Sequence, residues 1–134
     1  MAKFSSFEEI IAWQKGMILC NKIYEITKRG SFSKDFPLRN QIRRAAISIP
    51  ANIAEGFERD GNKELNQFLS IAKGSCGEVK TFLIIAKEQQ YIFEETFDQL
   101  YRLADEIGKM VGGWMVYLRK RNFKGYKYRT MIDK

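Results

Sequence analysis

The chain offers few side chains that could carry out catalysis. It has no histidine, which removes the most usual general base and the commonest zinc ligand, and its two cysteines are too few for a thiolate metal site. Gly74-Ser75-Cys76-Gly77 has the composition of a reactive loop, but it falls inside a helical heptad pattern, which favours packing. No phosphate loop of the GxxxxGKS/T or GxGxxG type occurs. We therefore predict no catalytic residue, no metal site, no cofactor and no enzymatic activity.

Basic residues are the strongest candidates for ligand binding. Residues 119–134 contain seven basic and one acidic residue, a net charge of +6 out of +7 for the whole chain. The other 118 residues hold 16 basic and 15 acidic groups, or +1. Basic side chains interleaved with Phe123, Tyr126 and Tyr128 suit phosphate attraction combined with base stacking, so we predict binding of RNA or single-stranded DNA. The predicted nucleic-acid contacts are Arg39, Arg43, Arg44, Arg59, Arg119, Lys120, Arg121, Lys124, Lys127 and Arg129.

Each basic group also has a structural interpretation. The C-terminal stretch is equally consistent with a solvated chain end. Ion pairs between helices or subunits explain the arginines of residues 39–59 more simply, because the rest of the chain is nearly neutral. A second functional hypothesis is an oligomeric scaffold that docks a partner protein, and salt separates the two because phosphate binding weakens steeply with ionic strength. An enzymatic or ligand-binding bundle would need a polar pocket in the core, for which no set of ligating residues is visible.

Turn-forming residues divide the sequence into four segments with helical periodicity. The breaks fall at residues 30–35, 59–62 and 90–91. Short links favour antiparallel neighbours, and no alternation typical of strands occurs, so we predict an all-α, up-down-up-down four-helix bundle over residues 1–121. Residues 122–134 form a separate basic tail in this division. The clearest apolar seam follows a heptad pattern through Phe93, Phe97, Leu100, Ala104, Ile107, Val111, Trp114 and Leu118.

The other three segments each present an apolar stripe of their own. Asn62 is the expected N-cap of the third helix. The stripe predicted for the first helix is Phe7, Ile10, Ile11, Met17, Ile18, Ile23 and Tyr24. Further apolar residues lie outside the stripes, and they are Trp13, Leu19, Ile26, Ile71, Phe82 and Ile85. One core cannot hold them all, so we predict a homo-oligomer.

Pro50 lies inside the apolar pattern of the second helix. It removes the hydrogen bond to the residue 46 carbonyl and disfavours α geometry at Ile49, so we predict a kink or short break there. The bend either steers the chain around the core or builds a specialised site. Asn52 could satisfy the carbonyl that the proline frees. Glu55, if buried, would need a cation from another helix or subunit.

The sequence also bears on location and redox state. No segment has the run of about 18 apolar residues that a membrane helix needs, and the N-terminus lacks the order of a signal peptide, so we expect a cytoplasmic protein with no membrane partner. Cys20 and Cys76 are 56 positions apart without a CxxC pairing. We predict that both are reduced thiols used as small core residues.

Two segments resemble a known family. QIRRAAISIPANIAEGFER (residues 41–59) and FLSIAKGSCGEVKT (residues 68–81) are similar to the four-helix-bundle family named for 23S rRNA intervening-sequence proteins. The resemblance spans Phe7 to Leu118, whereas Gly16 departs from it, because a helix former is more usual there. The matching positions are Arg43, Arg44, Ser48, Pro50, Asn52, Glu55, Gly56, Arg59, Gly74, Ser75 and Glu78.

This resemblance implies an antiparallel bundle that assembles into a pentameric ring. Some family members are encoded within inserts of large-subunit rRNA genes, and most have no established activity. Similar accessory proteins of diversity-generating retroelements bind nucleic acid and a reverse transcriptase through basic surfaces. A pentamer would carry five times +7, or +35. The resemblance assigns no catalytic role, so we predict structural roles for Ser48, Pro50, Asn52, Glu55, Gly56, Gly74, Ser75 and Glu78.

Overall fold

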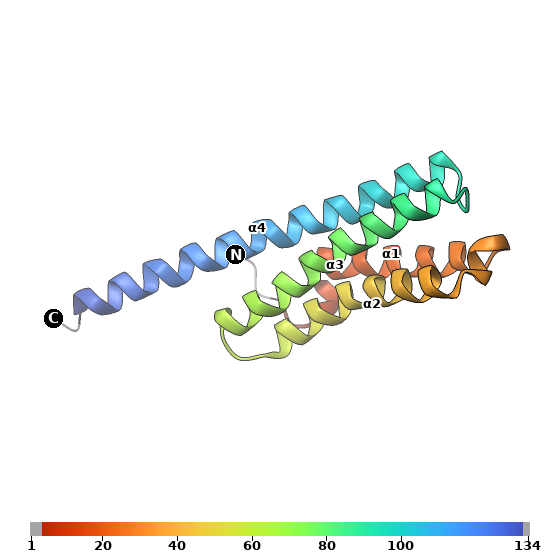
Figure 1. Ribbon diagram of the computed structural model, residues 1–134. Coiled ribbons are helices and arrows are strands. Elements are labelled where there is room, and N and C mark those ends of the chain that lie inside the picture. The colour runs from red at the N-terminus through yellow and green to blue at the C-terminus, as the bar shows by residue number, and fades with distance from the viewer. Residues whose placement is uncertain (1–3, 133–134) are drawn as a thin grey trace.

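Four α-helices and two short 3₁₀ turns make up the computed structural model, which describes residues 4–132 and the side chains of residues 4–121. One turn, Phe7–Glu9, precedes α1 (Ile11–Thr27), and the other, Gly30–Lys34, leads into α2 (Phe36–Glu58). The chain continues with α3 (Asn62–Glu88) and α4 (Glu94–Ile132). Figure 1 shows α1, α2, α3 and the first part of α4 side by side, with the last part of α4 extending beyond the α2–α3 turn.

The order of packing is that of an up-down bundle. Each helix contacts its neighbours in sequence, and α4 also contacts α1. The predicted all-α four-helix bundle is confirmed, and the predicted breaks coincide with the links between helices. The backbone of α4 passes residue 121 without interruption, so the division between a bundle over residues 1–121 and a tail over residues 122–134 stays a prediction.

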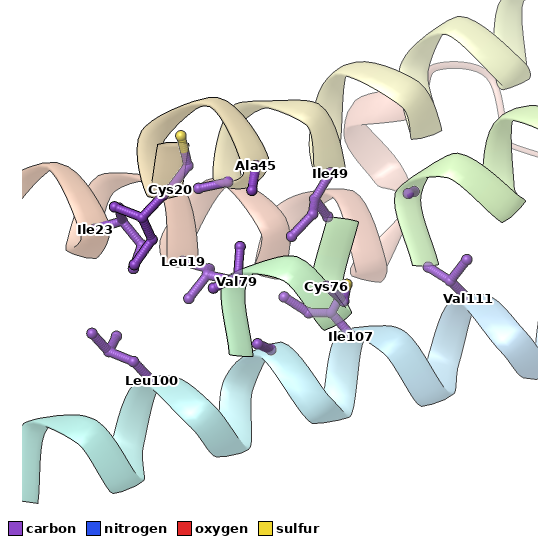
Figure 2. Packing of buried hydrophobic residues seen from close by; sticks show 14 of the residues in the cluster. Leu19, Cys20, Ile23, Ala45, Ile49, Cys76, Val79, Leu100, Ile107 and Val111 are labelled. Carbon is purple, nitrogen blue, oxygen red and sulfur yellow. The ribbon is translucent and has the colours of Figure 1, made fainter. Parts of the chain in front are cut away.

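The core is a column of aliphatic side chains from all four helices. Figure 2 shows Leu19, Ile49, Val79 and Ile107 gathered in it, and each of these side chains is 0% exposed. The stripes predicted for α3 and α4 supply most of their core residues. Phe93 is the exception, because it lies in the link before α4 and is 86% exposed.

Both cysteines are free and buried in this core, as predicted. Burial raises the pKa of the Cys76 thiol to about 12. Burial also raises the pKa of Cys20 above its ordinary value. Both thiols therefore stay protonated near neutral pH, where a protonated thiol is a poor nucleophile.

The stripe predicted for the first helix is right in part, since Ile10 and Ile23 are buried and Phe7 and Tyr24 pack against the core. Ile11, Met17 and Ile18 were expected inside, but they are 51%, 37% and 49% exposed. Leu19, expected outside the stripe, is completely buried. Large aliphatic residues surround most of this helix, so hydrophobicity alone does not fix its orientation, and small residues mark the contact side. The buried residues of α1 are Ala12, Gly16, Leu19, Cys20, Ile23 and Thr27.

The α1–α2 and α3–α4 links meet at one end of the bundle, which we call the closed end. Asp35 caps α2 by accepting a backbone N–H at 3.2 Å, and its second carboxylate oxygen accepts from the Tyr91 hydroxyl at 2.9 Å. The Tyr91 ring also stacks on buried Phe32, with centroids 5.3 Å apart. Gln90 turns the chain toward this contact with a left-handed φ of 62°. One tyrosine thereby joins both links.

α2 remains helical across Pro50, so the predicted break is absent, and the kink stays a prediction. Asn52 does not reach the residue 46 carbonyl, because residues four apart share a helix face and residues six apart do not. Its Nδ2 instead donates to the Ser48 carbonyl oxygen at 2.7 Å and to Ser48 Oγ at 2.8 Å. Ser75 of α3, which is 3% exposed, donates to the same Oγ at 2.8 Å. This polar chain ties α2 to α3.

The N-terminus of α3 lies one residue earlier than predicted. Gly61, not Asn62, occupies the N-cap position, and Asn62 is the first helical residue. The φ of Gly61 is 96°, a value that residues with a Cβ rarely adopt. The backbone of the α2–α3 turn therefore requires a glycine where the sequence pattern suggested a capping side chain.

Two glycines let α2 approach its neighbours closely. A Cβ on Gly16 of α1 would lie 3.2 Å from Ile49 Cγ2 and 3.4 Å from Pro50 Cδ. A Cβ on Gly56 of α2 would lie 2.9 Å from Phe68 Cβ on α3, closer than real Cβ atoms come. Gly16, the departure from the family pattern, thus makes room for the proline ring of the family motif.

The glycines of α3 and α4 divide into two kinds. A Cβ on Gly108 would lie 3.5 Å from Cys76 Cβ, and one on Gly112 would lie 3.3 Å from a lysine side chain of α3, so both mark helix contacts. Gly74 and Gly77 face open space, with no atom within 4 Å of an added Cβ. The 3.5 Å at Gly108 is ordinary van der Waals contact, and at Gly112 only the flexible end of a lysine would have to shift, so close approach requires a glycine at none of these four positions.

Replacing Gly56 by alanine tests the close approach of α2 and α3. Gly56→Ala should lower the free energy of unfolding by about 1 kcal/mol, because overpacking of about 1–3 kcal/mol outweighs a helix-propensity gain of about 1 kcal/mol. The control Gly74→Ala faces open space and should gain about 1 kcal/mol from propensity. Urea unfolding followed by circular dichroism measures both. Equal effects of the two substitutions would show that the contact at Gly56 is not tight.

The Asp35–Tyr91 contact predicts a stability loss at alkaline pH. Hydrogen bonding to Asp35 raises the pKa of Tyr91 above its ordinary value. The contribution of this hydrogen bond to the free energy of unfolding is therefore complete below the pKa of about 10 that tyrosine has in the unfolded chain. It is lost as the pH rises through the higher pKa of Tyr91 in the folded protein. Thermal unfolding between about pH 8 and pH 11 should show wild type losing stability relative to Tyr91→Phe. Parallel curves for the two proteins would contradict the contact.

Candidate nucleic-acid interface

Arg43 serves the contact between α1 and α2. Its Nε donates to the hydroxyl of Thr27 at 2.8 Å, and Thr27 is completely buried. The Thr27 hydroxyl donates in turn to the Ile23 carbonyl at 2.7 Å. The guanidinium also lies 4.6 Å from the centroid of the Tyr24 ring. Arg43 is thus held by hydrogen-bond and cation–π contacts within the bundle, not by the ion pair that the sequence suggested.

Arg39 is engaged in a similar way nearer the closed end. It donates to the Ser33 carbonyl at 3.0 Å, and its guanidinium lies 4.6 Å from the Phe36 ring centroid. Arg44 is exposed, and none of the described side chains contacts it with a hydrogen bond or an ion pair. Of the three arginines predicted near this end, Arg44 is therefore the one left available to a ligand.

Arg59 lies at the opposite end of α2, which we call the open end. Its Nε and Nη2 donate to Glu55 Oε1 at 3.1 and 2.7 Å, and its guanidinium lies 5.2 Å from the Phe68 ring centroid. The Glu55 side chain is 49% exposed and its partner is on its own helix. The expectation that Glu55 pairs with another helix or subunit is therefore wrong, because an arginine one turn away reaches it first.

The basic run of α4 begins where the core ends. Leu118, at 4% exposure, is the last core residue among the described side chains, and Arg119, Lys120 and Arg121 follow it on the exposed surface. Arg121 Nη1 donates to the hydroxyl of Tyr117 at 3.3 Å. None of the three is paired with a carboxylate among the described side chains. The side chains of Lys124, Lys127 and Arg129 lie outside the described residues.

An open cavity of about 400 Å³ lies at the open end, between the α2–α3 turn and α4, and we call it the terminal cavity. It brings together Arg59 and Arg121, which are 62 positions apart in the sequence. Four aromatic side chains, two arginines and the N-terminus of α3 surround it. Its lining residues are Phe4, Gly56, Phe57, Arg59, Gly61, Asn62, Leu65, Trp114, Tyr117, Leu118 and Arg121.

The aromatic wall of the terminal cavity was not predicted. Trp114 was expected in the core seam, and Tyr117 and Phe57 were not considered as ligand contacts. The signal was present, because Trp114, Tyr117 and Arg121 are spaced by three and four and must share one face of α4. What the sequence alone does not show is that the end of α2 lies opposite this face.

A larger groove of about 500 Å³ runs between α3 and α4 and is lined by four cations. Two of them, Lys80 and Lys109, are engaged by a carboxylate, whereas Lys73 and Arg119 have no described carboxylate partner. Lys80 and Lys109 both bind Asp105, at 2.8 and 3.0 Å. These contacts lower the pKa of Asp105, and the hydrogen bond with Asp105 raises the pKa of Lys80. Another ion pair, Lys15 with Glu106 at 2.7 Å, joins α1 to α4. The Lys80–Asp105 and Lys15–Glu106 pairs thus join neighbouring helices, whereas the Lys109–Asp105 pair lies within α4.

The family-motif residues divide into contact and surface positions. Ser48, Asn52 and Ser75 form the polar chain between α2 and α3, and Gly56 provides the close approach described above. Gly74 and Glu78 are exposed on α3. Among the described residues, no three Cys, Asp or Glu side chains are grouped to hold a metal ion, and no helix is long and apolar enough to cross a membrane.

These features define a helical bundle with close glycine-mediated contacts and a basic, aromatic open end. A family model described as 23S rRNA-intervening sequence protein matches residues 8–113, and the chain belongs to this family. A crystal structure of a protein with unknown function, from the S23 ribosomal protein family of Bacteroides thetaiotaomicron, has a similar fold. Its TM-score is 0.72 at 23% identity, over 78% of this chain and 98% of that chain. No protein with a curated description matches the chain.

The two neighbouring arginines of α2 should differ in their effect on stability. Arg43→Gln should lower the free energy of unfolding by about 1–3 kcal/mol, because it removes a charged hydrogen bond to a buried hydroxyl. The matched control Arg44→Gln changes the same charge at an exposed site without described contacts and should act within about 0.5 kcal/mol. Urea unfolding of both variants measures the difference. A neutral Arg43→Gln would show that this arginine is not structural.

Proposed function

We propose that this protein is a non-enzymatic, oligomeric helical bundle that binds single-stranded nucleic acid through its open end. The observation that carries the proposal is the state of Arg119, Lys120 and Arg121. They are exposed, they follow the last core residue, and no described carboxylate pairs with them. Phosphates are the anions that such an unpaired run of cations attracts most strongly.

The contrast with the bundle body supports this assignment. Lys15, Lys80, Lys87 and Lys109 are within 4 Å of carboxylates, and Arg39 and Arg43 are held by hydrogen bonds and aromatic rings. Residues 119–134 carry +6 of the net charge of +7. The described cations of this stretch, residues 119–121, are thus consecutive and unpaired, whereas the unpaired cations of the body, such as Lys22, Arg44 and Arg102, are separated along the chain. The family description refers to sequences that interrupt 23S rRNA, which favours RNA over DNA as the partner.

Self-association is the second part of the proposal. Met17 and Ile18 of α1 and Ile47 of α2 are exposed by 37–49%. A shallow cavity between these helices, lined by Trp13, Pro50 and other apolar residues, lies on the same side. Exposed apolar residues grouped in this way favour burial against another subunit. A ring of five, implied by the family resemblance, would multiply the basic ends and add avidity.

The non-enzymatic part of the proposal rests on the few reactive groups of the chain. There is no histidine to act as a base. Cys76 has its pKa raised to about 12 by burial, so it is protonated at neutral pH and packed in the core. The exposed carboxylates Asp105 and Glu55 are bound by neighbouring cations. None of these groups is arranged for proton transfer or nucleophilic attack.

A protein scaffold is the competing function, and a specific feature of α3 favours it. Ile71, Ile84 and Ile85 are exposed by 51%, 40% and 37% and leave apolar surface on this helix. A partner protein docked there would bind through apolar contacts, and its affinity would change little with salt. Nucleic-acid binding through the open end would weaken steeply with salt.

Salt-dependent binding to labelled single-stranded RNA tests the proposed function. The triple variant Arg119→Gln, Lys120→Gln, Arg121→Gln removes three phosphate contacts. Each phosphate contact on a single strand contributes about 0.7 to the slope of log Kobs against log salt. Loss of the three contacts should therefore make this slope shallower by about 2. Fluorescence anisotropy between about 50 and 200 mM salt measures it.

A matched triple variant separates location from net charge. Lys22→Gln, Arg29→Gln, Arg102→Gln removes the same charge from exposed positions on the body of the bundle. It should leave the affinity and its slope close to those of wild type. Equal losses in the two triple variants would point to general charge attraction, and absence of binding at low salt would leave the scaffold function in its place.

A further inference from the structure

The terminal cavity combines groups that recognise different parts of a nucleotide. Its lining includes four aromatic side chains and the guanidinium groups of Arg59 and Arg121. We propose that the terminal cavity binds one nucleotide of the bound strand, with the base stacked on the aromatic wall and the phosphate held by Arg59 and Arg121. This inference rests on the proposed function and assigns a defined site within it.

The aromatic wall suits a base. Phe57 and Trp114 are half-buried and pack against the core, so their rings are held in place, while Tyr117 is 37% exposed. Stacking of a base on such rings contributes about 1–3 kcal/mol and tolerates every base, because each has a π face. A volume of about 400 Å³ also lies within the range of about 300–1,000 Å³ found for small-molecule sites. The cavity therefore predicts stacking without sequence specificity.

The rim suits a phosphate. Among the described side chains, Arg121 is held by one hydroxyl at 3.3 Å, and Arg59 uses two of its three nitrogens on one oxygen of Glu55. Both guanidinium groups still have N–H donors that these contacts do not use. A planar guanidinium can donate two parallel hydrogen bonds to phosphate oxygens, which a lysine ammonium group cannot do. The N-cap residue Gly61 has no side chain that could cap α3, so the positive end of this helix also faces the cavity. Charge and geometry both favour an anion here.

Trp114 adds a polar group to the wall. Its indole Nε1 is buried without a hydrogen-bond partner among the described residues. A buried donor of this kind is unfavourable, and most are paired in native structures. Because the indole N–H lies in the plane of its ring, it can donate to an acceptor of a nucleotide whose base stacks on another aromatic ring of the cavity, such as Phe57 or Tyr117. Trp114 therefore serves as a hydrogen-bond donor and a reporter of occupancy.

Indole N–H signals of the full-length protein give a direct test. The chain has two tryptophans, so ¹⁵N-labelled protein shows two indole signals, and Trp13→Phe assigns them. Uridine 5′-monophosphate should shift the Trp114 signal and leave the Trp13 signal unchanged. Ribose 5-phosphate, which lacks a base, and uridine, which lacks a phosphate, should each produce a much smaller shift. An eight-nucleotide oligo(U) should shift the same signal at a lower concentration than the mononucleotide.

Matched arginine variants complete the test. Arg121→Gln should weaken uridine 5′-monophosphate binding about threefold to tenfold, whereas Arg102→Gln, an exposed arginine on the same helix, should have no effect. Equal shifts with ribose 5-phosphate would reduce the site to an anion site and overturn base recognition. Mononucleotide binding without an oligo(U) effect would overturn the assignment to a bound strand. An unmoved Trp114 signal, with oligonucleotide binding still present by anisotropy, would refute the cavity and leave the proposed function standing.

Discussion

The close packing of α2 between α1 and α3 is the constraint on which the rest of the structure depends. Gly16 leaves room for the ring of Pro50 on one side, and Gly56 leaves no space for a Cβ against Phe68 on the other. On the same helix, Ser48 Oγ accepts hydrogen bonds from Asn52 Nδ2 and from Ser75 Oγ of α3. A helix held on both sides in this way has a fixed position along the bundle axis relative to α1 and α3. Its last turn, with Arg59, therefore reaches a defined position opposite α4.

The same constraint separates structural charge from available charge. Inside the bundle, several lysines and arginines reach groups on neighbouring helices, as Lys80 does with Asp105 and Arg43 does with Thr27. α4 is the longest helix and continues past the point where α2 and α3 turn. Arg119, Lys120 and Arg121 have no carboxylate partner among the described side chains there. The length of α4 and its basic sequence together give a nearly neutral bundle one basic end.

Much of the fold could be predicted from sequence because the pattern is strong where large residues face one side. The heptad seam of α4 and the stripes of α2 and α3 are of this kind. The orientation of α1 could not, because its contact side is marked by Ala12 and Gly16, whereas Ile11 and Ile18 are exposed. The partners of Glu55 and Asn52 were also missed. Each partner lies four residues away, whereas we expected a cation from another helix or subunit for Glu55 and the residue 46 carbonyl for Asn52.

The candidate site was predicted in its parts and not as a whole. Arg59 and Arg121 were both proposed as nucleic-acid contacts, but only the packing of α2 against its neighbours places them at one cavity. Arg39 and Arg43 were proposed on the same grounds of charge, and the structure gives them partners within the bundle. Basic residue type is therefore a weak predictor of binding, because the contacts of each cation in the folded protein differ: Arg119, Lys120 and Arg121 have no described carboxylate partner, whereas Arg59 at the same end is paired with Glu55.

Photo-crosslinking of the full-length protein to single-stranded RNA carrying 4-thiouridine tests the central claim most directly. Mass spectrometry of the crosslinked peptides locates the bound strand without any change to the protein. Binding at the open end predicts crosslinks to Trp114, Tyr117 or Phe57, the aromatic residues of the terminal cavity. Crosslinks confined to Tyr24, beside Arg43 and Arg44 near the other end of the bundle, would contradict it.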